Sequence, residues 1–225
     1  MVKPDDLRAI FFYGTLEQNW LGHQMAEIYK DSIYQPFLPL QKAGTLALDI
    51  GANIGLVSLY FSRYFERVIA LEPSFEHFDA LNRNLQINKA ENVKPLKKAL
   101  YIKNGELPFG GPPTNKTMRT LHMSQWVNGK HDEMVETITL DKLFEDEKIE
   151  HVDLMKIDIE GTETEIVSAI GFKKVASKID VIMGELHYWN GRHPNQFKDA
   201  IKTNGFTYEV VEKLSNSEVF VAKRK

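Results

Sequence analysis

The sequence predicts an α/β protein with a mostly parallel sheet, an antiparallel C-terminal strand and an N-terminal helical extension. Three observations support this prediction. A glycine-rich turn separates two short apolar runs within residues 45–72, and apolar runs then alternate with segments of helical periodicity as far as residue 205. Two further apolar runs near the C-terminus are joined by a short turn, which is typical of an antiparallel pair.

Length and composition limit the possible partners. The 225 residues suit one α/β domain (45–225) with an N-terminal extension (1–44), and 43% hydrophobic residues can form a sizeable core. Lys and Arg total 28 against 31 Asp and Glu, and no long basic run is present. We therefore expect no nucleic-acid partner. Nothing in the composition indicates an oligomeric state.

The chain contains no cysteine, which excludes disulfides, zinc–thiolate sites and thiol nucleophiles. It does not begin with a basic segment followed by a long apolar core, and no run of about 18 uncharged apolar residues occurs. We therefore expect neither a signal peptide nor a membrane span, and a cytoplasmic protein.

Residues 1–44 are rich in aromatic side chains, and Met25, Ile28 and Tyr29 stand at helical spacing. Pro36 and Pro39 end this pattern before the first strand. We expect a helical cap that packs onto the domain. The alternative is that part of it forms a lid over a substrate pocket.

Residues 45–72 carry the pattern of a strand, a glycine-rich turn, a helix and a second strand. The first apolar run ends at Asp49, Gly51 and Gly55 follow, and the second run ends at Glu72. Glycines at this turn let the backbone approach a ligand at the start of the helix. An acid about 20 residues beyond the first glycine is suitably spaced to bind the hydroxyls of an adenosine ribose.

The loop favours S-adenosylmethionine over NAD. A dinucleotide pyrophosphate needs bare backbone N–H groups, and Asp49 would repel it, whereas a cationic sulphonium with an amino-acid end is compatible with an acid. The spacing Gly51-x-x-x-Gly55 also differs from the dinucleotide pattern of three glycines. The alternative is a glycine-rich turn that binds nothing.

The next segments continue the alternation. A helix follows Gly55, a strand spans 68–71, and Ser74 is expected to cap a helix with an apolar stripe that includes Leu81. On that helix Asn84 and Asn88 are interpreted as solvated or capping amides. Residues 93–100 are expected to form a third strand.

Residues 103–135 show no lasting periodicity and several turn signals, so an irregular segment is expected. It either contributes to acceptor binding or is mobile. The side chains considered for acceptor binding are Met118, Arg119, His122, Met123, Trp126 and His131.

Two later strands are expected to end in acids. The strand from Val152 leads to Asp158, Glu160 and Gly161, and Thr162 with Glu165 forms a capping box that starts a helix stopped by Gly171. The strand 179–183 leads to Glu185 and His187, a helix begins at Pro194, and 206–212 and 219–222 are expected to be the closing antiparallel strands.

Five motifs in this order resemble the FkbM-type methyltransferases, a branch of the class I S-adenosylmethionine-dependent enzymes. The resemblance covers roughly residues 45–187 and implies a Rossmann-like class I methyltransferase sheet. It also implies O-methylation of a hydroxyl on a small molecule or saccharide. The motifs are DIGANIG (49–55), ALEPS (70–74), LNRNLQIN (81–88), TLDKL (139–143) and LMKIDIEGTE (154–163).

The resemblance and the loop pattern together give a set of expected cofactor contacts. Asp49 would bind the methionine end directly or through water, Glu72 would hold the ribose, and Ala99 and Leu100 border the adenine by resemblance only. Asp158 is expected beside the reacting centre. The full expected set is Asp49, Gly51, Ala52, Asn53, Gly55, Glu72, Pro73, Ala99, Leu100 and Asp158.

The acids at the expected strand ends also provide catalytic candidates. Asp158, Glu160, Glu185 and His187 are assigned to base or acceptor positioning; the plainer alternatives are a surface histidine at 187 and a helix-start carboxylate at 160. Like charges raise one another's pKa unless a cation compensates. A metal-free base is favoured over a divalent metal, because the ligand spacing is not that of a dedicated metal loop.

Two other functions stay open at this stage. One is an N-methyltransferase for nucleic acid, although the chain has KIDIEG where an NPPY-like strand end would be expected. The other is a cofactor-binding partner subunit without chemistry of its own. Detectable methyl transfer would exclude the second.

Overall fold

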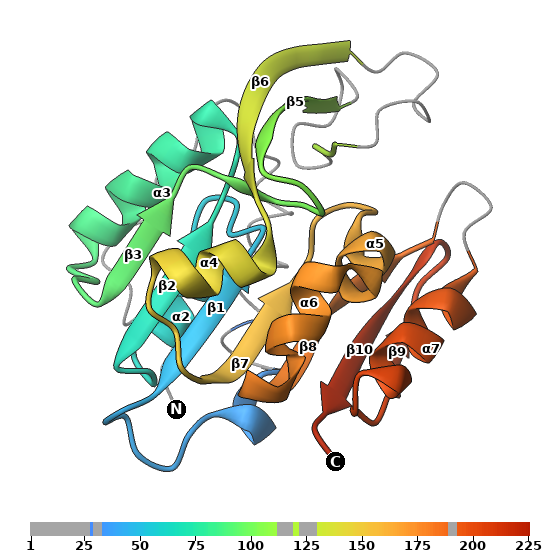
Figure 1. Ribbon diagram of the computed structural model, residues 1–225. Coiled ribbons are helices and arrows are strands. Elements are labelled where there is room, and N and C mark those ends of the chain that lie inside the picture. Colours follow the sequence, from blue (N-terminus) through green and yellow to red (C-terminus); the bar gives the residue numbers. More distant parts are fainter. Residues whose placement is uncertain (1–27, 29–32, 112–118, 122–129, 189–192) are drawn as a thin grey trace. The chain divides into compact units, whose positions relative to one another are not determined.

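The computed structural model (Figure 1) describes residues 28, 33–111, 119–121, 130–188 and 193–225. The chain divides into two compact units, Met1–Lys97 and Lys98–Lys225. Most of the expected helical cap lies outside the described residues, as do five of the seven aromatic side chains before residue 44. The division at residue 44 therefore stays a prediction.

The first unit contains a parallel sheet in the order β3-β2-β1. All five residues of β1 are buried, as expected for a strand covered on both faces. Tyr60, Phe61 and Phe65 are almost completely buried beside it. The elements are the 3₁₀ turn η3 (Gln35–Phe37), β1 (Leu46–Ile50), α2 (Leu56–Phe61), β2 (Arg67–Leu71), α3 (Phe75–Ile87) and β3 (Val93–Leu96).

The second unit contains two sheets. One is three-stranded, in the order β4-β6-β5, and the other runs β7-β8-β10-β9. The elements are β4 (Ala99–Leu100), β5 (Gly105–Gly111), β6 (Lys130–Ile138), α4 (Leu140–Asp146), β7 (Val152–Ile157), α5 (Glu163–Ser168), α6 (Ile170–Val175), η5 (Ala176–Lys178), β8 (Ile179–His187), α7 (Pro194–Thr203), β9 (Glu209–Lys213) and β10 (Ser217–Lys223).

The pairing confirms the predicted fold class. Strands β7 and β8 are parallel, and β10 is antiparallel to both β8 and β9. Gly184 lies opposite Ile157 in the β7–β8 register, and a Cβ at position 184 would come within 1.7 Å of the Ile157 carbonyl oxygen. Only glycine therefore lets β8 continue past the end of β7 and carry Glu185 and His187 in regular strand geometry.

Two strand predictions were wrong. The expected strand 93–100 is split, because Val93–Leu96 pairs with β2 while Ala99–Leu100 pairs with β6 in another sheet. The segment 103–135 is not irregular throughout, since Gly105–Gly111 and the start of β6 form an antiparallel pair. Of the acceptor candidates in this segment, the structure describes the side chain of Arg119, which forms an ion pair with Glu133 at 3.3 Å; the others lie outside the described side chains.

Four local predictions also failed. Ser74 and Thr162 occupy N-cap positions but make no side-chain capping hydrogen bond; buried glutamates accept the N–H groups of Ser74 and Gly161. Gly171 lies inside α6 and does not stop a helix, since α5 ends at Ser168. The fifth strand extends to His187 rather than Met183.

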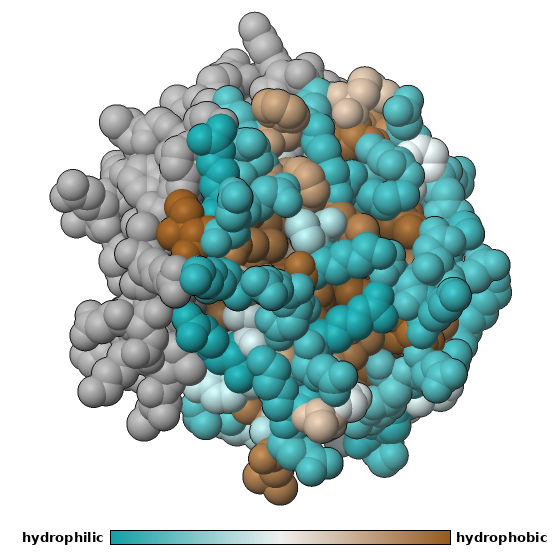
Figure 2. All heavy atoms as spheres, turned by 90° about the vertical axis from the view of Figure 1, so that its left-hand side faces the viewer, coloured by the Kyte–Doolittle hydropathy of each residue, from teal (hydrophilic) through white to brown (hydrophobic). Residues whose placement is uncertain are grey.

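Figure 2 shows one face of the molecule, on which hydrophilic side chains separate the exposed apolar ones into small patches. The large exposed hydrophobic side chains of the described residues are spread over several elements, such as Phe75 of α3 and Ile170 of α6. Within the described part of the chain, no helix has the length and apolar character that crossing a membrane requires.

Candidate functional site

The glycine-rich loop of the first unit has the backbone that its sequence predicts. Gly51, Asn53 and Gly55 have positive φ angles of 79°, 51° and 90°. The N–H groups of Gly51 and Ala52 both donate to the carbonyl of Leu71, at 3.0 and 2.9 Å. The loop between β1 and α2 is therefore fixed directly to the end of β2.

Glu72 has a structural task in addition to the predicted ribose contact. Its Oε2 accepts the N–H of Asn53 and its Oε1 accepts the N–H of Ser74, both at 2.9 Å. The side chain is only 7% exposed, and His77 Nδ1 lies 3.8 Å from Oε1. Pro73, the next expected contact, is buried.

Asn84 holds the far side of the same loop. Its amide donates to the carbonyl of Ile54 at 2.7 Å, and its side chain is completely buried. The interpretation of Asn84 as a solvated or capping amide was therefore wrong, whereas Asn88 is the C-cap residue of α3. A Cβ at Gly55 would lie 2.5 Å from Leu81 Cδ1, so this glycine also permits close packing against α3.

Asp49 lies inside the protein rather than on the loop surface. It is completely buried, and its Oδ2 accepts the hydroxyl of Ser58 at 2.5 Å. Ala99 and Leu100 lie in β4 of the second unit, paired with Thr137 and Ile138, and are nearly fully buried.

The second unit brings together all four predicted catalytic residues. Asp158 and Glu160 follow β7, and Glu185 and His187 lie at the end of β8. His187 is 3% exposed, and its Nε2 lies 3.5 Å from Glu160 Oε2 and 3.4 Å from Glu185 Oε1. The interpretation of His187 as a surface residue is thereby excluded.

Two further groups lie at this cluster: Glu163 was not expected from the sequence, and Lys156 was not counted as a charge partner of Asp158. Glu163, completely buried at the start of α5, accepts a hydrogen bond from His187 Nδ1 at 3.0 Å. Lys156 Nζ lies 3.6 Å from Asp158 Oδ2. The available signal for Glu163 was an acid at the first position of a helix, two residues after Gly161. We call Asp158, Glu160, Glu163, Glu185 and His187 the His187 cluster.

Burial and mutual repulsion set the protonation of this cluster. Burial raises the pKa of Glu160 from 4.5 to about 8. The positive charge of His187 lowers this pKa, and the negative charges of Asp158 and Glu163 raise it. Burial, followed by the charge of Asp158, also raises the pKa of Glu185. Burial would lower the pKa of His187, but the charge and hydrogen bond of Glu163 outweigh it and raise that pKa to about 10.

At neutral pH His187 is therefore a charged imidazolium that lies beside a protonated Glu160. A carboxyl group with a pKa near 8 can act as a general base slightly above neutral pH. The imidazolium can donate a hydrogen bond from Nε2 but cannot accept a proton until about pH 10. Glu160 can thus accept a proton, while the neighbouring His187 can only donate a hydrogen bond.

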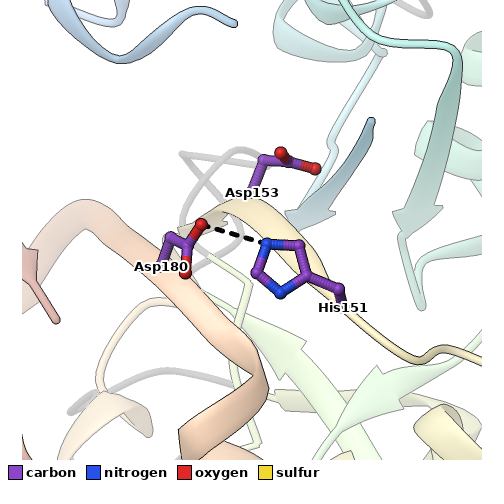
Figure 3. Close-up of side chains that lie close together, drawn as sticks. All are labelled: His151, Asp153 and Asp180. Atoms are coloured by element: carbon purple, nitrogen blue, oxygen red, sulfur yellow. Dashed lines mark hydrogen bonds and ion pairs between the residues drawn. The ribbon is translucent and has the colours of Figure 1, made fainter. Parts of the chain in front are cut away.

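Two groups of side chains in the described residues have the spacing of metal ligands. Asp158, Glu185 and His187 offer atoms within 4.8 Å of one another, and so do His151, Asp153 and Asp180. The second group lies at the beginnings of β7 and β8; there His151 Nε2 faces Asp180 Oδ2 at 3.0 Å (Figure 3). Asp180 also lies 3.7 Å from Arg224, so this half-exposed group is a surface ion-pair network.

Comparison with known families identifies the chain. The model of the methyltransferase FkbM domain matches residues 49–208. The chain belongs to the FkbM methyltransferase family. This confirms the resemblance drawn from the motifs and assigns the protein to a family of S-adenosylmethionine-dependent methyltransferases.

Two curated relatives are informative. Methyltransferase sdnD of Sordaria araneosa is 30% identical over 178 residues, covering 64% of this chain and 66% of that protein. Hexuronic acid methyltransferase AglP of Haloferax volcanii is 26% identical over 179 residues, covering 79% of this chain and 69% of that protein. The chain thus spans about two thirds of the length of these FkbM relatives.

Solved structures support the fold alone. Precorrin-6y C5,15-methyltransferase of Geobacter metallireducens matches with a TM-score of 0.50 and 15% identity, covering 100% of this chain and 98% of that one. A precorrin 8w decarboxylase from Methanobacterium thermoautotrophicum matches with a TM-score of 0.51 and 13% identity over the full length of both chains. Both are consistent with the Rossmann-like architecture of this FkbM protein.

Replacing Glu160 with glutamine should change how stability depends on pH. Because the folded-state pKa of Glu160 is about 8 against 4.5 in the unfolded chain, its contribution is present below pH 4.5 and is lost as the pH rises through 8. As the pH rises, the free energy of unfolding of the wild type should therefore fall relative to that of Glu160→Gln, by about 1.4 kcal/mol for each unit by which folding raises the pKa of Glu160. Urea unfolding between about pH 5 and pH 9 measures the difference.

The exposed Glu150, which precedes β7, provides the control for this measurement. Glu150→Gln should leave the pH dependence of unfolding as in the wild type. Parallel stability curves for the wild type and Glu160→Gln across the same pH range would contradict the raised pKa.

Proposed function

We propose that this FkbM protein transfers a methyl group from S-adenosylmethionine to a hydroxyl oxygen of a small molecule or saccharide. The observation that carries the proposal is the His187 cluster, which contains a carboxyl group with a pKa near 8 next to a buried imidazolium. A hydroxyl acceptor must lose its proton during the reaction, and Glu160 is suited to receive it.

The loop residues of the first unit fit the cofactor. Gly51 and Gly55 carry no side chain and have positive φ angles, so the backbone of the turn is open to a ligand, and the buried Glu72 carboxylate accepts the N–H groups of Asn53 and Ser74 beside it. In this proposal Glu72 holds the ribose hydroxyls, the backbone of 51–55 accommodates the methionine end, and Asp49 acts through water. When bound, the cofactor supplies an electrophilic methyl group on a sulphonium.

The protein's own part in the chemistry is orientation and proton transfer. His187 Nε2 lies 3.5 Å from Glu160 Oε2 and 3.4 Å from Glu185 Oε1, so the positive charge of the imidazolium attracts both carboxyl groups. Glu160 would take the proton of the acceptor hydroxyl as its oxygen is methylated. Asp158 and Glu185 position the acceptor, and Lys156 offsets part of their negative charge.

The charge of the cluster also indicates the acceptor class. The cluster contains four carboxyl groups and one imidazolium, and the acids that stay ionised around a protonated Glu160 would repel a carboxylate acceptor but not a neutral hydroxyl. AglP is named for a hexuronic acid, a saccharide that carries hydroxyl and carboxyl groups. We assign a saccharide or similar polyol hydroxyl to this chain.

A divalent metal at Asp158, Glu185 and His187 is the alternative to the metal-free base. A metal ligand at His187 must be a neutral imidazole, whereas the carboxylates around this ring favour its charged form. The metal-free mechanism therefore remains our proposal for this site.

Glu72→Ala should weaken cofactor binding. The substitution removes charged hydrogen bonds worth about 1.5–3 kcal/mol, which corresponds to a loss of roughly 10- to 150-fold in affinity. Calorimetric titration with S-adenosylhomocysteine measures the loss, and NAD should not bind. The exposed Glu91, in the loop before β3, provides the control variant Glu91→Ala. Equal affinity of Glu72→Ala and the wild type would remove Glu72 from the cofactor site.

Glu160→Gln and Glu185→Gln should each lower turnover by about 10²-fold while leaving S-adenosylhomocysteine affinity nearly unchanged. The assay measures methyl transfer to a panel of neutral saccharides and polyols, with carboxylate acceptors as the comparison. Failure of the wild type to methylate any hydroxyl would refute the proposed function. Activity abolished by EDTA and restored by magnesium would replace the base with a metal.

A further inference from the structure

We infer that Glu163 is a positioning residue of this site, acting on both His187 and Glu160 through a single carboxylate oxygen. The inference rests on the proposed function, since it assigns Glu163 a part in proton transfer. Glu163 was not among the residues expected from the sequence, and its side chain is completely buried.

The first contact fixes the imidazole ring. Glu163 Oε1 lies 3.0 Å from His187 Nδ1, so Nδ1 must carry a proton that it donates to this carboxylate. The ring orientation that follows points Nε2 at Glu160 and Glu185, at 3.5 and 3.4 Å. Glu163 therefore determines which nitrogen faces the proton-accepting carboxyl.

The same oxygen fixes the backbone that carries Glu160. The N–H groups of Ile159 and Gly161 both donate to Glu163 Oε1 at 3.1 Å. Between them, Glu160 has a φ of 58°, which is unusual for a residue other than glycine, and Gly161 has a φ of 111°. Holding the N–H group on each side stabilises this strained turn and keeps the Glu160 side chain directed at His187.

The two contacts have one electrostatic consequence. The negative charge of Glu163 supports the imidazolium at His187, and the charge of His187 is the main factor opposing the rise in the pKa of Glu160. Loss of the Glu163 charge lowers the pKa of His187 and also removes a direct repulsion that raises the pKa of Glu160. The charge of His187 acts on Glu160 more strongly than that of Glu163, so Glu160 holds its proton to a higher pH wherever His187 has lost its charge.

Glu163→Gln separates this role from simple support of the turn. Glutamine has the same shape, and its carbonyl oxygen still accepts the N–H groups of Ile159 and Gly161, but it carries no charge. The ascending limb of the pH profile of kcat/KM should move from about pH 8 to higher pH. Turnover at neutral pH should fall about tenfold for each unit that the pKa of Glu160 rises, with S-adenosylhomocysteine affinity unchanged.

The matched control is Glu218→Gln in β10. Glu218 is also a buried carboxylate of the second unit, but its partners are Lys198 at 2.9 Å and the hydroxyl of Tyr208 at 2.6 Å. This variant should lose stability without moving the kcat/KM limb. If the ascending limb of the kcat/KM profile of Glu163→Gln lies at the same pH as in the wild type, the inference is overturned and Glu163 is a turn-stabilising residue only.

A second readout does not depend on activity. The ring nitrogens of His187, followed by NMR, should titrate at least one pH unit lower in Glu163→Gln than in the wild type and Glu218→Gln. An unchanged His187 titration would overturn the inference even if methyl transfer is observed. If no acceptor is methylated, the proposed function fails, and the NMR titration alone decides whether Glu163 positions and charges His187.

Discussion

The structure of the candidate site depends on one constraint, which is the burial of His187 among four carboxylates. The imidazolium is the one positive charge in direct contact with Glu160, Glu163 and Glu185 in the described residues, while Lys156 reaches Asp158. So much negative charge is tolerable in a buried site only if part of it is neutralised by protonation. A protonated Glu160 and a charged His187 follow directly from that condition.

The two units use the same local device. In each, a buried glutamate accepts two backbone N–H groups, at least one of which belongs to a turn that contains positive φ angles. Glu72 does so for Asn53 and Ser74, and Glu163 for Ile159 and Gly161. The same carboxylates face the groups to which we assign function, so the strained turns and the functional side chains are held by shared contacts.

Much of the fold followed from patterns that are local in the sequence. Apolar runs ended by acids predicted β1, β2, β7 and β8, and the loop around Gly51 and Gly55 has the positive φ angles that its glycines indicated. The split of 93–100 between two sheets was not predictable, because strand pairing depends on distant partners such as β6. An apolar pattern indicates that a strand is buried, but it does not indicate which strand pairs with it.

The predicted site residues were placed correctly in part for the same reason. Acids at strand ends are visible in a sequence, and Asp158, Glu160, Glu185 and His187 do lie together. Glu163 was not expected, Lys156 was not counted and Asn84 was misinterpreted, because the role of each comes from contacts with residues distant in the sequence or from full burial. In the sequence alone, a buried acid or amide on a helix looks the same as a solvated one.

The central claim is that buried electrostatics keep Glu160 protonated at neutral pH. It is tested most directly by NMR titration of the glutamate side-chain carboxyl carbons in ¹³C-labelled protein, with the Glu160 signal assigned by its absence from Glu160→Gln. A signal that titrates with a midpoint of about pH 8 is the predicted result. A Glu160 signal that titrates near the ordinary value of 4.5 would contradict the account.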